Sequence, residues 1–415
     1  MEITKGVQLH FIKSKKFKTN KIRVRFSSPI SASTIAGRVL AASMLETANQ
    51  VYPTSQKFRE RLAALYGANY STNLSKRGLM HYVDINLSFV KDTFLSRKNA
   101  LTTDILDFLK TTLFSPLVEN HAFDTKTFEI EKKNILNDLE AEIENHFYHA
   151  HRELDKLYYD AEEMQIPRVA TIELLQKETA ESSFQIFQDM LKKDQIDFFF
   201  IGDFNEIAIR EIVEEFGFEG RKQAIRLNYQ QEYSNILREN LDQKDVHQSI
   251  LELAYHFSIQ YGDAEHIPLV VLNGLLGGFA HSKLFTNIRE KAGLAYTISS
   301  HFDIFSGMLR IYAGIDRKNR TKTFSLVNRQ ISDLKRGNFL EEELEHTKKM
   351  IKNSMLLAQD RQNTLIERSY MSAILGSQFL SIDSWLEALE EVNREDIIQA
   401  ASCLKLQAIY FMEGK

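Results

Sequence analysis

Hydrophobic and polar positions along this chain change period in an order that occurs twice. Residues 21–27 have the pattern of a strand, and residues 35–48 follow with apolar side chains at helical spacing. Those apolar positions are Ile35, Val39, Ala42 and Leu45. The same order returns about 220 positions later, where the strand-like residues 248–256 precede the apolar segment 267–276. A repeat of this length predicts two related structural units.

A glycine turn and two strands are expected at the same place in each half. Gly67 and Tyr70 in the first half, and Gly293 and Tyr296 in the second, share the pattern Gly-x-x-Tyr. The second strand after each turn alternates apolar and polar residues, which predicts that one of its faces lies in a core. The apolar positions are Val83, Ile85, Leu87 and Phe89, and then Leu309, Ile311, Ala313 and Ile315.

Helices are expected to cover these sheets. Residues 125–143 and 341–357 are long segments with a polar face and apolar positions such as Ile135 and Leu139. Each half then closes with a short helix and a strand. These closing elements are expected at residues 182–187 and 197–201, and again at residues 395–401 and 407–412.

This order of elements predicts an α+β fold with two homologous domains, each an antiparallel-rich β-sheet covered by helices. We expect an N-terminal domain at residues 1–222 and a C-terminal domain at residues 245–415, joined by a polar linker at residues 223–244. The hydrophobic content of 43% is sufficient for two cores, and only five prolines occur in 415 residues.

Composition and charge narrow the partners that the chain can have. The formal net charge is −4 and acids and bases are intermixed, so no basic stripe follows a phosphate backbone and we expect no nucleic-acid partner. The single cysteine, Cys403, excludes a disulfide within the chain. No signal-peptide pattern and no stretch of roughly 20 apolar residues is present, so we expect a cytoplasmic protein without a membrane span.

Two motifs in the second half carry a family resemblance. They are Gly277-Gly278-x-x-x-Ser282-x-Leu284-Phe285 and Arg289-Glu290-Lys291-x-Gly293-Leu294-Ala295-Tyr296. Together with the internal repeat, they make nearly the whole chain resemble the insulinase, pitrilysin and mitochondrial processing-peptidase family of zinc metallopeptidases. The resemblance implies a half-shell of the processing-peptidase type, and some members of that family pair two such chains.

Active members of that family carry His-x-x-Glu-His in the first domain, where the histidines bind zinc and the glutamate activates a water. The matching stretch here begins at Ser43 and ends at Thr47, so hydroxyls replace both imidazoles and only Glu46 remains. For the third ligand, a glutamate on a later helix, the resemblance gives Asp138 as the counterpart. Hydroxyls are poor zinc ligands at neutral pH, so we expect no metal site and no catalytic residue in this chain.

Other interpretations of these residues stay open. Glu46 and Asp138 also fit a solvated helix face, which needs no function. His146, His149 and His151 form a histidine-rich segment, which is typical of a surface or an interface. The alternative is an unconventional metal site that combines this segment with Glu46 and Asp138.

The second domain keeps the Arg/Tyr motif of the family, whereas the first domain has lost the zinc-binding histidines. The resemblance assigns Arg289 and Tyr296 to substrate binding, because a guanidinium offers donors to peptide carbonyls and a phenol can donate to a developing oxyanion. It places Gly277 and Gly278 in a turn near the same substrate. The structural alternative is a surface ion pair for Arg289 and a strand-filling role for Tyr296.

From this asymmetry we expect a non-catalytic subunit, a pseudoenzyme, that forms a peptide-holding chamber with a zinc-bearing paralogous subunit and supplies Arg289 and Tyr296. We expect no cofactor in this chain, with zinc in the partner. Two alternatives remain: a homodimeric scaffold that binds peptide without hydrolysis, and a metallopeptidase with an unconventional metal site.

Overall fold

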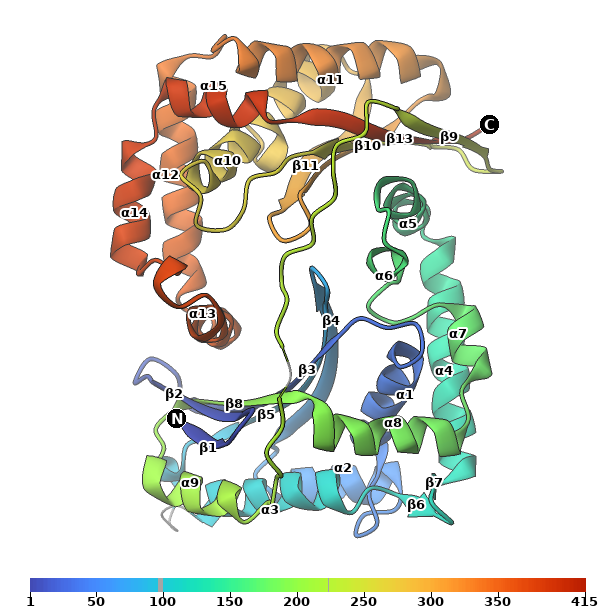
Figure 1. The fold of residues 1–415 in the computed structure, drawn as a ribbon, viewed down its shortest axis with the longest axis vertical. Coiled ribbons are helices and arrows are strands. Elements are labelled where there is room, and N and C mark those ends of the chain that lie inside the picture. The colour runs from blue at the N-terminus through green and yellow to red at the C-terminus, as the bar shows by residue number, and fades with distance from the viewer. Residues whose placement is uncertain (96–99, 223) are drawn as a thin grey trace. The chain divides into compact units, whose positions relative to one another are not determined.

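The computed structural model describes residues 1–95, 100–222 and 224–415, which form two compact units (Figure 1). Unit 1 consists of Met1–Ala141, Ile166–Leu227 and Asp360–Tyr370. Unit 2 consists of Glu142–Gln165, Asn228–Gln359 and Met371–Lys415. Each unit contains one large, mostly antiparallel β-sheet with helices packed on it, which confirms the predicted α+β class.

The sheet of unit 1 has the strand order β1-β2-β8-β3-β5-β4. Its strands are β1 (Glu2–Thr4), β2 (Val7–Lys13), β3 (Thr19–Pro29), β4 (Asn69–Arg77), β5 (Met80–Val90) and β8 (Gln195–Gly202). Within the described part of this sheet, β2 and β8 run parallel and the other neighbouring strands run antiparallel. Ile22, Val24 and Phe26 of β3 alternate into the buried core, as strand geometry requires.

Helices of unit 1 bury their apolar faces against this core. They are α1 (Ile35–Thr47), α2 (Ser55–Ala64), η1 (Asp92–Phe94), α3 (Ala100–Phe114), α4 (Thr125–Glu144), α7 (Ile172–Lys177), α8 (Ala180–Lys193) and α9 (Glu206–Glu214). The short strands β6 (Val118–Glu119) and β7 (Ala122–Phe123) pair between α3 and α4. Helix α1 packs against α8 and against strands β4 and β5, which places it beside the outer edge of the sheet.

The sheet of unit 2 has the strand order β11-β12-β10-β13-β9. Its strands are β9 (Arg238–Gln243), β10 (Ser249–His256), β11 (Ala295–Asp303), β12 (Met308–Ile315) and β13 (Lys405–Glu413). The helical elements that follow along the chain are α10 (His266–Asn273), η2 (Gly274–Gly278), η3 (Phe285–Lys291), η4 (Arg317–Asn319), α11 (Arg320–Lys335), α12 (Glu341–Ala358), η5 (Gly376–Gln378), α14 (Ile382–Glu391) and α15 (Arg394–Ser402). Most of them contribute to a second buried core with β10 and β12.

Each unit also contains a helical segment from the other half of the sequence. Helix α5 (His146–Tyr158) belongs to unit 2 and packs on β10, β13 and β9, with the short helix α6 (Glu162–Gln165) behind it. The first part of α13 (Gln362–Leu375) belongs to unit 1. The packing units are therefore not continuous stretches, unlike the division at residues 223–244 expected from the repeat.

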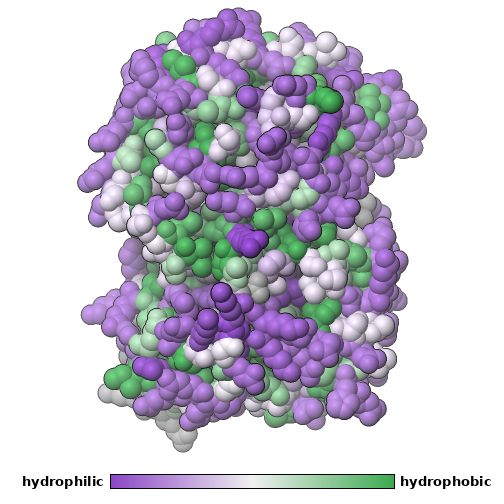
Figure 2. All heavy atoms as spheres, viewed as in Figure 1, coloured by the Kyte–Doolittle hydropathy of each residue, from purple (hydrophilic) through white to green (hydrophobic). Residues whose placement is uncertain are grey.

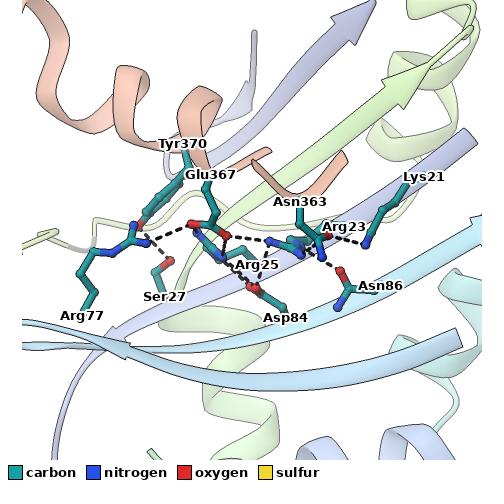
Figure 3. A network of polar contacts seen from close by, with 10 residues as sticks. All are labelled: Lys21, Arg23, Arg25, Ser27, Arg77, Asp84, Asn86, Asn363, Glu367 and Tyr370. Carbon is teal, nitrogen blue, oxygen red and sulfur yellow. Dashed lines mark hydrogen bonds and ion pairs between the residues drawn. The ribbon is translucent and has the colours of Figure 1, made fainter. Parts of the chain in front are cut away.

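A polar network attaches the start of α13 to the sheet of unit 1 (Figure 3). Arg23 and Arg25 lie on the face of β3 opposite the apolar core and are almost completely buried. Glu367 of α13 accepts a hydrogen bond of 2.7 Å from Arg23 and one of 2.5 Å from Arg25, and Asp84 of β5 pairs with Arg25 at 2.8 Å. The guanidinium of Arg25 also lies 4.6 Å from the centre of the Tyr370 ring.

Hydrophilic residues dominate the face of the molecule drawn in Figure 2, with apolar residues in smaller groups among them. In the described ranges, no helix combines the length and the apolar character that crossing a bilayer requires.

Candidate functional site

Helix α1 presents the degenerate motif, and its two hydroxyls meet one carboxylate. Ser43 and Thr47 are four residues apart, so they lie on the same face of the helix. Ser43 Oγ donates to Glu131 Oε2 of α4 at 2.8 Å. Thr47 Oγ1 lies 2.9 Å from Glu131 Oε1 and 3.1 Å from the Ser43 carbonyl oxygen, so its single proton is shared between two acceptors. Glu131 therefore joins α4 to α1.

The acid that reaches these hydroxyls is Glu131, whereas the family resemblance pointed to Asp138. Asp138 lies seven residues further along α4, about 10 Å away along the helix axis, and its side chain is exposed. Sequence reasoning missed Glu131 because α4 carries several acids. A signal was present: Glu131 falls in the inward-facing stripe formed by Phe128, Ile135 and Leu139.

This donor set does not fit a zinc ion. Zinc sites in proteins use imidazole, thiolate and carboxylate ligands, and here only one carboxylate is combined with two neutral hydroxyls. Both hydroxyls already donate to that carboxylate. Within residues 1–95, 100–222 and 224–415, no group of three or more His, Cys, Asp or Glu side chains is arranged to hold a metal ion.

The carboxylate of Glu46 is hydrogen-bonded to strand β4. Its Oε2 accepts hydrogen bonds of 2.7 Å from both the backbone N–H and the hydroxyl of Thr72 on β4. Strand β4 is the outer edge of its sheet, so Thr72 N–H points to the side where a further strand would pair. Glu46 thus caps part of that edge. The neighbouring positions 43 and 47 are Ser and Thr, so they provide no imidazole pair to hold the metal-bound water that such a glutamate would activate.

The histidine-rich segment forms helix α5 and docks it on the sheet of unit 2. His149 Nε2 lies 3.3 Å from Asp242, and His151 Nδ1 lies 2.5 Å from Glu252. Glu252 is completely buried, and burial raises its pKa despite the contacts with His151 and Arg310. His149 and His151 therefore have separate carboxylate partners, which supports the interface interpretation of this segment.

Arg289 and Tyr296 both lie in unit 2 and both are exposed. Arg289 is on η3, where its guanidinium packs 4.5 Å from the centre of the Phe285 ring. Its Nε is 3.9 Å from Glu290, a contact too long for a strong ion pair. Tyr296 donates to Asp316 Oδ1 at 2.9 Å, and this hydrogen bond and the charge of Asp316 raise the pKa of Tyr296. The phenol therefore keeps its proton.

A β-bulge turns Tyr296 outward. In the pairing of β11 with β12, Ala295 faces Ile315 and Thr297 faces Gly314, so Tyr296 is the extra residue. Tyr70, at the same place in the first repeat, pairs regularly with Leu87 and is 1% exposed, whereas Tyr296 is 62% exposed. One sequence pattern thus gives a core residue in unit 1 and a surface residue in unit 2.

Gly277 and Gly278 end the π-helical turn η2, which packs on β11. A Cβ atom on Gly277 would lie 2.6 Å from the backbone nitrogen of Ser300, so only glycine fits at this position. Ser299 Oγ donates to the Gly277 carbonyl at 2.8 Å. These contacts give Gly277 a packing role, and the role of both glycines in substrate binding stays a prediction.

The comparisons with known proteins agree with this geometry. The family described as "Peptidase M16 inactive domain" matches residues 177–351. The chain is 30% identical to the probable inactive metalloprotease YmfF of Bacillus subtilis (strain 168) over 410 residues, which is 99% of this chain and 96% of that protein.

Solved structures show the same fold over the whole length. A conserved protein from Enterococcus faecalis V583 has a TM-score of 0.96 and 36% identity, and the match covers 100% of this chain and 98% of that one. A peptidase M16 inactive domain from Pseudomonas fluorescens has a TM-score of 0.79 at 16% identity, covering 99% and 96%. The chain therefore belongs to the M16 peptidase family, and it carries Ser43 and Thr47 where the family resemblance expects zinc-binding histidines.

Proposed function

We propose that this protein is the non-catalytic subunit of a two-chain zinc peptidase. In this proposal it forms a peptide-holding chamber with a zinc-bearing paralogous subunit and supplies Arg289 and Tyr296 to the bound peptide. The zinc and the water-activating glutamate belong to the partner. The location we expect for this pair is the cytoplasm.

The observation that carries the proposal is an asymmetry between the two units. In unit 1, the ligand positions Ser43 and Thr47 are tied to Glu131. In unit 2, Arg289 is 43% exposed with a weakly held guanidinium, and Tyr296 projects from a bulge with its proton retained. Unit 2 thus keeps an exposed guanidinium and an exposed phenol, whereas the ligand positions of unit 1 carry hydroxyls in place of imidazoles.

An extended peptide is expected to bind by adding a strand to a sheet edge. Strand β11 is one edge of the sheet in unit 2, and Tyr296 lies in that strand. In unit 1, Glu46 already occupies the Thr72 N–H on the edge strand β4. This difference favours β11 as the edge that receives peptide.

The test is peptide cleavage by a zinc-bearing M16 paralogue from the same organism, with and without this chain. We expect the mixture to cleave a fluorogenic peptide faster than the paralogue alone. Tyr296→Phe should lower this gain by up to about 100-fold, the usual effect of removing one oxyanion donor. Equal cleavage by the paralogue alone would contradict the proposal.

Matched controls separate a site effect from a general surface effect. Tyr66 is 65% exposed in unit 1, so Tyr66→Phe should leave cleavage unchanged. Arg329 is 74% exposed on α11, so Arg329→Ala should leave cleavage unchanged, whereas Arg289→Ala should lower it. If light scattering instead finds only a homodimer and no paralogue gains activity, the scaffold alternative replaces this proposal.

A further inference from the structure

Unit 2 contains a pocket that the residues discussed so far do not line. Its volume is about 430 Å³, and its walls come from residues 228–233, from residues 256–260, and from Ile304, Ser306 and Gly307. All three segments belong to unit 2. This size falls in the range of pockets that hold small ligands or a single large side chain.

The wall formed by residues 228–233 is fixed in place by hydrogen bonds. Tyr229 N–H donates to the Phe305 carbonyl at 2.7 Å. Gln231 Nε2 donates to the Tyr158 carbonyl at 2.9 Å, and Gln231 Oε1 accepts from the Tyr229 hydroxyl at 2.8 Å. The pocket is therefore preformed, which lowers the entropy lost when a ligand binds.

His256 offers a free hydrogen-bond acceptor in this pocket. The Tyr158 hydroxyl donates its proton to the Gly307 carbonyl at 2.6 Å, so its oxygen accepts from His256 Nδ1–H at 3.2 Å. Nε2 of the imidazole is then unprotonated. Burial and the nearby Lys405 lower the pKa of His256, so the ring stays neutral near pH 7.

The pocket wall carries other polar groups with unused capacity. The side chains of Gln230, Glu232 and Ser258 have no hydrogen bond or ion pair with any residue that the structure describes. The ring of Tyr233 stacks on His256, with centroids 6.1 Å apart, and adds a flat aromatic surface. Aromatic surface and unengaged acceptors thus lie around one cavity.

Charge limits the class of ligand. Among the described residues that line the pocket there is no lysine or arginine, and Glu232 disfavours an anion. Lys405 lies 4.8 Å from the centre of the Tyr233 ring and disfavours a cation. The groups that remain suit an uncharged side chain with an aromatic or planar body and a donor at its end, such as a phenol or a carboxamide.

We propose that this pocket is a specificity subsite that holds an uncharged tyrosine or glutamine side chain of a bound peptide. The inference rests on the peptide-binding part of the proposed function and adds the kind of side chain that is selected. The donor of that side chain reaches His256 Nε2 or Glu232, and its planar part packs against Tyr233.

The test measures binding of N-acetylated amino-acid amides to the full chain by saturation-transfer NMR, without any partner. N-acetyl-tyrosinamide should bind about five-fold more tightly than N-acetyl-phenylalaninamide, which differs only by the hydroxyl and lacks one hydrogen bond. The glutamine amide should bind, and the glutamate and lysine amides should bind several-fold more weakly. Equal affinity for the tyrosine and phenylalanine amides would overturn the subsite.

Two variants test the acceptors separately. His256→Asn keeps a donor toward Tyr158 but removes Nε2, and Glu232→Gln alters an exposed side chain that leaves the fold unaffected. At least one of these variants should reduce the ratio of the affinities for the tyrosine and phenylalanine amides to about one. Glu342→Gln on α12, a matched exposed acid, should leave this ratio unchanged. This binding assay does not depend on cleavage. If the cleavage assay with the paralogue fails but the chain still prefers the tyrosine amide, the two-chain function is rejected and the subsite is not.

Discussion

At the scale of single residues, the motif on α1 that resembles a zinc site is held by hydrogen bonds among three side chains. Ser43, Thr47 and Glu131 form a hydrogen-bonded group that links α1 and α4. The two hydroxyls need an acceptor because they are only partly accessible to solvent. Glu131 supplies that acceptor, so the group has a structural role that does not depend on metal.

Removing Glu131 should therefore destabilise the protein. We expect Glu131→Ala to lower the free energy of unfolding by about 1–3 kcal/mol, because two hydroxyls lose a charged acceptor. Asp138→Ala, on the exposed face of the same helix, should change it by less than about 0.5 kcal/mol. Urea denaturation of both variants decides which acid faces α1, and the reverse order of effects would contradict the contacts described.

The same contacts predict how a metal site could be restored. The double substitution Ser43→His and Thr47→His should create a zinc site with Glu131 as the third ligand, because both replaced side chains already touch that carboxylate. Equilibrium dialysis should then find about one zinc per chain. Adding Glu131→Ala should abolish binding and adding Asp138→Ala should not; dependence on Asp138 would show that the resemblance chose the correct acid.

At the scale of elements, each sheet has one apolar face and one face that depends on charged side chains. Arg23 and Arg25 would be costly to bury alone, and the carboxylates of Asp84 and Glu367 offset that cost. In unit 2, Glu252 on β10 is buried under α5 and is paired with His151 and Arg310. Charged pairs thus attach α13 to the first sheet and α5 to the second.

The attachment of α13 should depend on pH. Burial alone would raise the pKa of Glu367, but Arg25, Arg77 and Arg23 outweigh it and lower the pKa from its usual 4.5 to about 2. A lowered carboxylate pKa stabilises the fold above pH 4.5, and this contribution is lost as the pH falls from about 4.5 to 2. Unfolding measured across this range should show that loss in the natural chain.

The substitution Glu367→Gln should remove most of this pH dependence and lower stability near pH 7 by about 2–4 kcal/mol, since it leaves the buried Arg23 and Arg25 to share Asp84 as their charged partner. Asp360→Asn serves as the control, because Asp360 is 68% exposed and pairs with the exposed Lys16. Identical pH profiles for the natural chain and Glu367→Gln would mean that the network contributes no stability.

At the scale of the whole molecule, the two halves of the sequence are not independent folding units. Residues 142–165 complete unit 2 and residues 360–370 complete unit 1. A fragment that contains only residues 228–415 would leave Glu252 without His151 and would expose the face of β10 and β13 that α5 covers.

We therefore expect the fragment 228–415 to unfold at lower urea concentration, and less cooperatively, than unit 2 does in the full chain. Supplying residues 142–165 as a separate peptide should stabilise it in proportion to peptide concentration. A peptide with His149 and His151 replaced by alanine is the matched control and should stabilise it less. Full stability of the fragment alone would show that α5 is not required.

The sequence by itself determined the fold class, the internal repeat and the absence of a zinc-binding histidine pair, because these follow from local periodicity and from residue identity. The strands β5 and β12 and the long helices α4 and α12 lie where the hydrophobic pattern predicted them. The roles expected for Arg289, Tyr296, Gly277 and Gly278 stay predictions.

Only the tertiary structure decided which acid meets Ser43, which of the two Gly-x-x-Tyr tyrosines is buried, and which half of the chain covers each sheet. Arg23 and Glu367 are separated by 344 positions, and Tyr158 and Gly307 by 149. Local periodicity shows which face of an element is apolar, but it does not show which distant segment packs on the opposite face. Those choices depend on long-range packing and on the pairing of buried charges.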